Sequence, residues 1–490
     1  MKEFKYSGSW WLPDSQVKVT GDLIFSNEEG PRLDLDASFD EHTFWERAEA
    51  NKRATYPIVL GLTKDAKLIT LCDCEETSVR TAFKTTDEGS FVYNSAGYDA
   101  RAAFIGAHFT DAQEMQFNRA QVQYDYLPDF VRKQGFTIDP ATKEGVLQKY
   151  ALTYEYPPKI TATTSKGEIS VSYTFHQEGA PLKGLILRQS TALDITPEQD
   201  FSLKELDINY IRPLQDLISL ATNRPNPITS LNVYSKNKVE TIMNHIREVP
   251  IEVVFQQDPY KERQDVLLPT DKLLFSLQDQ VVSDRFSEII ERWLNNTDIA
   301  ELGDVFHLFF GVLYDPDLSR EIEFLNIAFA AELYHRKRFS NEVLPKSEHK
   351  ARVKSIVDSA PAEHREWLNN VLSFSNEPLF RDRIDQLVEI TKEVVSPLFS
   401  DKDYFVNKAK DTRHYRVHND RRLEKKAAKD AELFWTTKTL SYLVRTCLLM
   451  ELGLTSQDCF ELFSKNREYK LVSELGSKFG NQATQQENTR

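Results

Sequence analysis

The chain has 490 residues, and its 61 lysines and arginines stand against 75 aspartates and glutamates, a net charge of −14. This length predicts about two to four domains with buried cores, and the 40% hydrophobic content excludes disorder over most of the chain. The acidic balance argues against a protein that coats nucleic acid, because such binding depends on lysine and arginine facing phosphate.

Targeting and cofactor signals are missing from the sequence. Residues 1–14 lack the apolar core of a secretory signal, and no run approaches the roughly 18 apolar residues of a membrane span. The four cysteines do not form a disulfide framework, and no pair of them has the spacing of zinc ligands. We therefore expect a soluble, cytoplasmic protein without a cofactor, a bound metal or a membrane partner.

The amino-terminal half is predicted to be rich in β-strands. Runs in which apolar residues alternate with polar ones predict strands or hairpins, and they occur at residues 17–25, 33–39, 58–62, 67–71, 169–175, 231–234 and 250–255. A turn cluster lies at residues 27–31, and one amphipathic helix is predicted at residues 203–221. This pattern predicts a sandwich-like or barrel-like antiparallel domain with a helical insertion.

Beyond a linker at residues 256–270, the hydrophobic period becomes helical. Apolar stripes of helical spacing occur at residues 286–294, 319–338, 381–395 and 431–452. The carboxyl-terminal half is therefore predicted to be an all-α bundle, which makes the chain an α+β multidomain protein. The predicted boundaries are residues 1–265 for the β-rich domain, 266–478 for the helical domain and 479–490 for a flexible polar tail.

One segment of the helical half differs from the rest of the chain in charge. Residues 407–426, which the sequence places between two helices, carry eight basic and three acidic residues, so the local charge is 8 − 3 = +5. Two of the ten histidines, His414 and His418, lie within this segment. A basic island with clustered histidines in an acidic chain is the expected footprint of a site for an anionic substrate.

These residue types suit RNA cleavage without a metal. Such cleavage needs a group that takes the proton of the 2′-hydroxyl, a group that protonates the leaving 5′-oxygen, and a cation for the phosphate. Histidine can fill either proton role near neutral pH, and arginine binds phosphate oxygens in a fork. Arg413 and His418 lie about 140° apart on a helix, so they converge best at a helix start or across two subunits.

Residues 413–418 form an R-x4-H motif before a long apolar helix, and this region resembles the HEPN ribonucleases. That resemblance implies a metal-independent RNase whose two copies pool their motifs in one cleft. Residues 8–13, 19–23 and 104–109 are similar to the amino-terminal domain of ApeA-type proteins, anti-phage abortive-infection factors that end in a HEPN domain. Together the two resemblances cover nearly the whole chain in the right order.

The resemblance implies roles for individual residues. His418 would be the general acid/base and Arg413 the phosphate clamp. His414 stands where asparagine is most common, so it is either a second acid/base or a helper that orients phosphate. Further RNA contacts are assigned to Arg416, Arg421 and Arg422. The implied partners are structured host RNA such as tRNA, a second copy or a higher oligomer, and a phage-derived trigger sensed by the amino-terminal half, which would also restrain the RNase.

Other interpretations of these residues remain open. The segment could be a solvated basic turn, with Arg421 and Arg422 on an exposed helix face. His414 and His418 are four residues apart and could share a metal, but a third ligand and a nearby glutamate are missing. The whole protein could also be a non-catalytic module that binds RNA or a partner. Glu332 and His335 could face the motif, although a surface position is the expectation.

Overall fold

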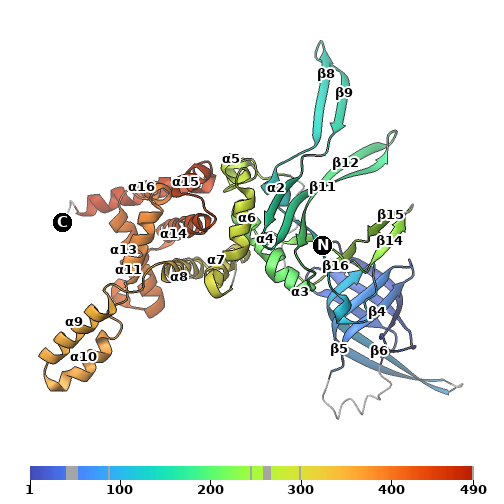
Figure 1. The fold of residues 1–490 in the computed structure, drawn as a ribbon, viewed down its shortest axis with the longest axis horizontal. Coiled ribbons are helices and arrows are strands. Elements are labelled where there is room, and N and C mark those ends of the chain that lie inside the picture. The colour runs from blue at the N-terminus through green and yellow to red at the C-terminus, as the bar shows by residue number, and fades with distance from the viewer. Residues whose placement is uncertain (40–52, 87–88, 243–244, 258–265, 297–298, 488–490) are drawn as a thin grey trace. The chain divides into compact units, whose positions relative to one another are not determined.

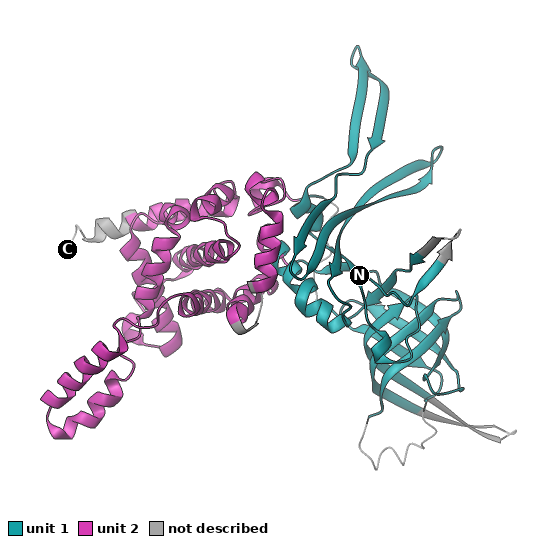
Figure 2. Cartoon of the chain, viewed as in Figure 1, with its two compact units in different colours: residues 1–218, 226–267 teal, residues 219–225, 268–490 magenta. Residues whose placement is uncertain are grey.

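The structure is a computed structural model of the chain, shown in Figure 1. It describes every residue except 40–52, 87–88, 243–244, 258–265, 297–298 and 488–490, so most of the predicted linker lies outside the described residues. The chain divides into two compact units (Figure 2). The first comprises residues 1–218 and 226–267, and the second comprises residues 219–225 and 268–490.

The first unit contains an antiparallel β-barrel. Its strands follow the order β6-β3-β2-β1-β4-β5, and β5 pairs again with β6, which closes the sheet on itself. Closure removes free sheet edges and encloses a core to which Trp10, Leu23 and Val59 contribute. The barrel strands are β1 (Phe4–Trp11), β2 (Val19–Ser26), β3 (Gly30–Leu35), β4 (Thr55–Thr63), β5 (Leu68–Thr86) and β6 (Gly89–Ile105).

An open sheet continues from one edge of β6. Residues 96–99 of that strand pair with β3, whereas residues 103–105 pair with β16, so the edge is shared between the barrel and the extension. The extension runs in the order β16-β13-β7-β12-β11-β10. Its strands are β7 (Arg119–Tyr124), β10 (Ile160–Thr164), β11 (Gly167–Ala180), β12 (Gly184–Pro197), β13 (Ile228–Tyr234) and β16 (Ile251–Val254).

The remaining elements of this part of the chain are short. Two two-stranded ribbons and a helical insertion complete it: β8 (Phe136–Lys143), β9 (Val146–Tyr154), β14 (Val239–Ile242), β15 (His245–Glu248), α2 (Leu127–Val131), α3 (Leu203–Leu206), the π-helical turn η2 (Asp207–Ile211) and α4 (Arg212–Thr222). Ser202 and Glu205 form a capping box that begins the helical insertion at the predicted place. The predicted hairpin at residues 58–71 is β4–β5, in which Leu62 pairs with Leu68.

The second unit is built from helices around α14. This helix is buried on nearly all sides because apolar residues continue around it, and α6, α8, α12, α15 and α16 contact it. The helices are α5 (Gln280–Ser283), α6 (Phe286–Asn296), α7 (Asp304–Tyr314), α8 (Arg320–Arg338), α9 (Lys346–Ser359), α10 (Arg365–Leu372), α11 (Phe380–Ile390), α12 (Lys392–Val395), α13 (Lys402–His418), α14 (Asp430–Glu451), α15 (Ser456–Phe463) and α16 (Arg467–Glu487). The predicted order, a β-rich domain followed by a helical region, is confirmed.

Two features of the helical unit were not predicted from the sequence. Helix α16 continues to Glu487, so a helix occupies most of the residues assigned to a polar tail. Its earlier turns pack on the other helices, where Tyr469, Val472 and Gly476 are buried and Phe479 lies against Trp435. Helices α9 and α10 form a hairpin that projects from the other helices of the unit (Figure 2).

No helix among the described residues combines the length and the apolar composition needed to cross a bilayer.

Candidate functional site

Helix α13 carries the basic motif. The Asp401 side chain accepts a hydrogen bond from the Tyr404 amide at its start, and Asn419 ends it in the left-handed conformation at φ 52°. The motif therefore lies in the last turns of a helix, and only residues 419–426 of the basic segment lie between two helices. Of the two arrangements in which Arg413 and His418 could converge, this placement does not provide the helix start. The helix continues because its buried residues, Phe405, Val406, Ala409 and Thr412, follow a helical stripe through the basic sequence.

Thr412 fixes the end of α13 against the chain that follows. Its side chain is fully buried, and its hydroxyl oxygen accepts a hydrogen bond of 2.8 Å from the backbone amide of Ala428. Ala427 and Ala428 are themselves buried just before α14 begins. The segment between α13 and α14 is thus held at both ends, while the polar residues between them stay exposed.

His414 and His418 lie side by side on the exposed surface of α13. Their spacing of four residues places one imidazole above the other, with ring centroids 5.0 Å apart. Within the described part of the chain, neither imidazole takes part in a hydrogen bond to another residue. Both rings are therefore accessible to a substrate or to a second protein chain.

Arg413 points in a different direction, toward helices α8 and α11. Its guanidinium lies over the rings of Phe329 and Phe380, at 5.6 Å and 5.1 Å from their centroids, and Nη2 donates to Oε2 of Glu332 at 2.8 Å. The side chain is 19% exposed. The structure thus brings Arg413 together with Glu332, and it gives no direct contact between Arg413 and either imidazole of the motif.

Glu332 and His335 do not lie on the surface, so that part of the prediction is wrong. Glu332 is 13% exposed and His335 is fully buried, where its Nε2 hydrogen-bonds Gln386 Oε1 at 2.7 Å. Burial lowers the pKa of His335, and the nearby Arg383 guanidinium acts in the same direction. The sequence did contain a signal, because His335 continues the buried stripe of α8 four residues after Ala331.

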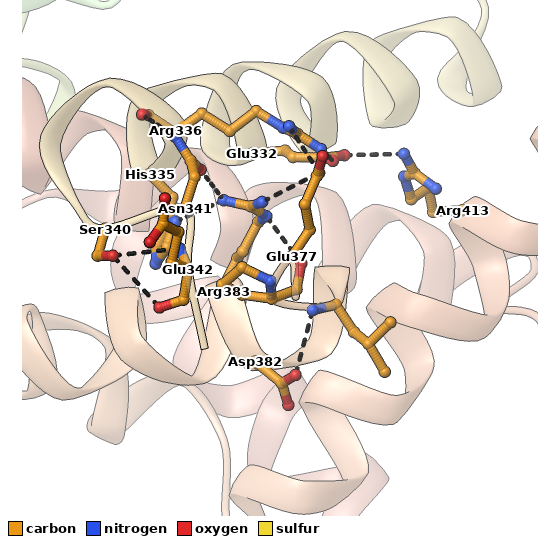
Figure 3. A network of polar contacts seen from close by, with 12 residues as sticks. Glu332, His335, Arg336, Ser340, Asn341, Glu342, Glu377, Asp382, Arg383 and Arg413 are labelled. Carbon is orange, nitrogen blue, oxygen red and sulfur yellow. Dashed lines mark hydrogen bonds and ion pairs between the residues drawn. The ribbon is translucent and has the colours of Figure 1, made fainter. Parts of the chain in front are cut away.

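A network of alternating charges surrounds these residues (Figure 3). Glu332 is shared between Arg413 and Arg336, and Arg336 donates from Nη1 to Glu377 at 3.1 Å. The fully buried Arg383 completes the network, and it donates hydrogen bonds to Pro378 and Asn341. Sequence reasoning missed Arg336, Glu377 and Arg383, because the contacts that join α8 to Glu377 and Arg383 link residues about 40 to 50 positions apart in the chain.

The other three arginines predicted to contact RNA have different environments. Arg416 is 27% exposed and pairs with Glu321 of α8 at 3.3 Å, whereas Arg421 is exposed at the start of the 3-10 turn η7 (Arg421–Leu423). Arg422 is 89% exposed and binds Asp420 at 2.7 Å. Hydrogen bonds from Arg422 lower the pKa of Asp420 to about 2.

The described residues contain no group of three histidine, cysteine, aspartate or glutamate side chains placed to share a metal ion. His414 and His418 therefore have no third protein ligand in the described part of the chain. The chemistry that this arrangement can supply is proton transfer by exposed imidazoles beside a guanidinium and a basic turn.

The fold and the site together define a class of protein, in which a β-barrel-containing amino-terminal domain precedes a helical domain with a basic R-x4-H motif. Comparison with protein families agrees with this class. The ApeA N-terminal domain 1 model matches residues 5–293, and the Apea-like HEPN model matches residues 325–458. The first match covers more than half of the chain, so the protein belongs to the ApeA family, as the sequence resemblance predicted.

Neither a curated protein nor a solved structure matches the chain. The HEPN match includes the whole motif on α13 together with Glu332, Glu377 and Arg383. HEPN domains are typically ribonuclease domains that bind RNA, and their combination with an ApeA domain is typical of defence proteins.

Proposed function

We propose that this protein is a metal-independent RNA endonuclease that acts as the toxic effector of an anti-phage abortive-infection response. The observation that carries the proposal is the exposed pair His414 and His418, which lie one and five residues after Arg413 on the same helix, within the matched HEPN domain. Exposed imidazoles can exchange protons near neutral pH, and a guanidinium can stabilise charge on a phosphate.

The proposed reaction is an attack by the 2′-hydroxyl of the substrate on the adjacent phosphorus. The new 2′-oxygen–phosphorus bond forms as the bond to the 5′-oxygen breaks, which leaves a 2′,3′-cyclic phosphate and a 5′-hydroxyl. One imidazole takes the 2′ proton and another protonates the leaving oxygen. His418 is assigned as general acid/base, Arg413 as phosphate clamp and His414 as the second imidazole or as an orienting group.

A homodimer through the HEPN domain supports this chemistry. Arg413 is directed toward α8 and α11, while the imidazoles face outward, so one copy of α13 does not surround a phosphate. Two copies facing each other would supply imidazoles and cations from both sides of one cleft. Arg416, Arg421 and Arg422 are proposed as weaker RNA contacts, and structured host RNA such as tRNA is the proposed substrate.

The two parts of the chain are proposed to have different roles, catalysis and regulation. Residues 266–478 would form the catalytic domain, and residues 1–265 would sense a phage-derived trigger and restrain the RNase in its absence. A toxic RNase needs such restraint, and the amino-terminal match to an ApeA domain supports a separate regulatory part.

End-group analysis of RNA tests the proposal. Purified full-length protein is incubated with bulk tRNA in EDTA, alone and with extract of phage-infected cells as a source of the trigger, and the same reactions are run with His418→Ala and with His307→Ala. His307 is a matched control, because it is an exposed histidine of the same unit on α7. We expect cyclic-phosphate and 5′-hydroxyl ends from the parent and the control, and a loss of about 10²- to 10⁴-fold in rate for His418→Ala.

Other outcomes would contradict the proposal in different ways. Cleavage that EDTA abolishes would point to a metal-dependent phosphodiesterase. RNA that is retained but never cut would point to a non-catalytic binding module. Equal cleavage by the parent and His418→Ala would remove that residue from the mechanism.

A further inference from the structure

The guanidinium of Arg413 is held on several sides but keeps unused hydrogen-bond donors. Phe329 and Phe380 provide aromatic contacts, and Glu332 accepts one hydrogen bond from Nη2 at 2.8 Å. The buried Nε of Arg413 has no hydrogen-bond partner within the described residues. Arginine carries five N–H donors in a rigid fork, so one carboxylate contact orients the group without exhausting it.

Glu332 is itself held from the opposite side. Its Oε1 accepts a hydrogen bond of 3.3 Å from Nη2 of Arg336, which lies one helical turn later on α8. Oε1 and Oε2 thus face different arginines, and the carboxylate cannot turn without weakening one of the two contacts. Because only 13% of the Glu332 side chain is exposed, water competes weakly with the two arginines for hydrogen bonds to this carboxylate.

Arg336 is in turn connected to the buried Arg383 through Glu377. Its Nη1 donates to Oε2 of Glu377 at 3.1 Å, and Nη2 of the fully buried Arg383 lies 3.9 Å from the same oxygen. Arg383 is fixed by hydrogen bonds to Pro378 O, Asn341 Oδ1 and the His335 ring (Figure 3). The contacts around Arg413 therefore reach the fully buried Arg383 through two partly exposed side chains, Arg336 at 38% and Glu377 at 42%.

The network contains three guanidinium groups and two carboxylates, so its charge is 3 − 2 = +1. Arg413 forms the end of the network nearest the imidazoles, because Glu332 is its carboxylate partner and it lies on the helix that carries His414 and His418. An incoming phosphate would supply the missing negative charge at that end. Because Glu332 also pairs with Arg336, it would stay in place when Arg413 binds the phosphate.

We propose that Glu332 is a positioning residue that fixes the guanidinium of Arg413 in the orientation needed by the phosphate in the transition state. Arg336, Glu377 and Arg383 hold Glu332 in place. This inference rests on the proposed RNase function and adds to it a residue outside the R-x4-H motif. Glu332 acts through Arg413, and it does not touch the RNA.

The experiment compares Glu332→Gln with Glu323→Gln. Glu323 is a matched control on the same helix, where it is 21% exposed and pairs with Lys438 at 3.1 Å. Cleavage of bulk tRNA in EDTA gives kcat and KM, and phenylglyoxal modification of each arginine is followed by mass spectrometry in the absence of RNA. Arg336→Gln serves as a second variant that loosens Glu332 without removing it.

We expect Glu332→Gln to lower kcat on the order of 10- to 100-fold with little change in KM, because misplacing a reacting group costs rate more than binding. Arg413 should become several-fold more reactive toward phenylglyoxal, because it loses its ion pair. Arg336→Gln should change both measurements in the same direction and to a smaller extent. Glu323→Gln should resemble the parent in both.

Each alternative result has a separate meaning. Unchanged modification of Arg413 in both Glu332→Gln and Arg336→Gln would overturn the positioning contact, whatever the activity. Increased modification with equal or higher kcat would show that Glu332 restrains the enzyme, and it would overturn the positioning role while the RNase function stands. A parent protein that leaves tRNA intact both alone and with extract of phage-infected cells would overturn the proposed function, and the positioning role with it.

Discussion

The cations of α13 and those of the turn that follows it differ in what surrounds them. Every lysine and arginine of the basic stretch on α13 pairs with a carboxylate: Lys408 with Glu432, Lys410 with Asp411, Arg413 with Glu332 and Arg416 with Glu321. On the turn, Arg422 pairs with its neighbour Asp420. Arg421, Lys425 and Lys426 are exposed and form no ion pair with any described residue.

The comparison shows that the net charge counted along a sequence segment does not give the electrostatic potential at the protein surface. The segment carries a charge of +5, yet carboxylates from α8 and α14 compensate much of the helical part. Three of those carboxylates lie outside the segment, which is why a count along the sequence omits them. The turn is left as the part of the segment whose positive charge is least compensated, and we expect it to be the part that attracts RNA most strongly.

The largest expected effect comes from reversing the charges of the turn. Changing Arg421, Lys425 and Lys426 to glutamate in a His418→Ala background should weaken binding of labelled tRNA about 100-fold at 0.1 M salt, since each phosphate contact is sensitive to salt. The triple change Lys346→Glu, Lys350→Glu and Lys354→Glu on α9 is the charge-matched control. An equal loss for both sets would mean that total charge matters and that the turn has no special role.

The second prediction concerns stability and separates Arg413 from Arg421. Arg413→Ala should lower the free energy of unfolding by about 2 kcal/mol, because it leaves the nearly buried Glu332 with one partner and removes contacts to two rings. Arg421→Ala should stay within about 0.5 kcal/mol of the parent. Urea unfolding measures both, and similar values for the two variants would contradict the contrast between helix and turn.

A smaller effect on stability is expected where Thr412 connects the end of α13 to the residues before α14. Thr412→Val keeps the shape of the side chain but leaves the buried amide of Ala428 without its acceptor. The loss should be about 1 to 2 kcal/mol in the free energy of unfolding. Thr412→Ser keeps the hydroxyl and serves as the control. If valine and serine unfold at the same urea concentration, this hydrogen bond contributes nothing to holding the turn.

The smallest expected effect is a dependence on acidic pH at Asp420. Arg422 lowers the pKa of this carboxyl from 3.8 to about 2, so its contribution to stability is present above about pH 4 and is lost as the pH falls toward 2. Arg422→Ala should raise the pKa of Asp420, although the backbone N–H of residue 422 continues to lower it. Carbon-detected NMR titration of Asp420 measures the change, and an unchanged value would show that the ion pair does not form in solution.

Much of the fold follows from hydrophobic periodicity. The alternating runs became strands such as β2 and β11, and the helical stripe of residues 431–452 became α14, which ends before Gly453 at φ 88°. Closure of the barrel did not follow from sequence, because it depends on the pairing of β5 with β6 in addition to β4. The continuation of α16 into the predicted tail was missed because the sequence of the tail is polar and has no apolar stripe of helical spacing.

The candidate site likewise has features that the sequence predicted and features that it did not. The spacing of His414 and His418 sufficed to predict two neighbouring imidazoles if the segment is helical, and they are neighbours. The direction of Arg413 could not be predicted from spacing, since it depends on Glu332 and Phe329 of α8 and on Phe380 of α11. The burial of Glu332 and His335 likewise depends on which helices cover α8.

The sequence by itself determined that this protein belongs to the ApeA family, that a β-rich half precedes a helical half, and where the basic motif lies. These properties are carried by local order along the chain: periodicity, capping residues and short motifs. Only the tertiary structure decided which cations of the motif are compensated and which stay exposed. Charges interact through space, and the carboxylates that hold Arg413 and Arg416 come from a helix about 80 to 95 positions earlier in the chain.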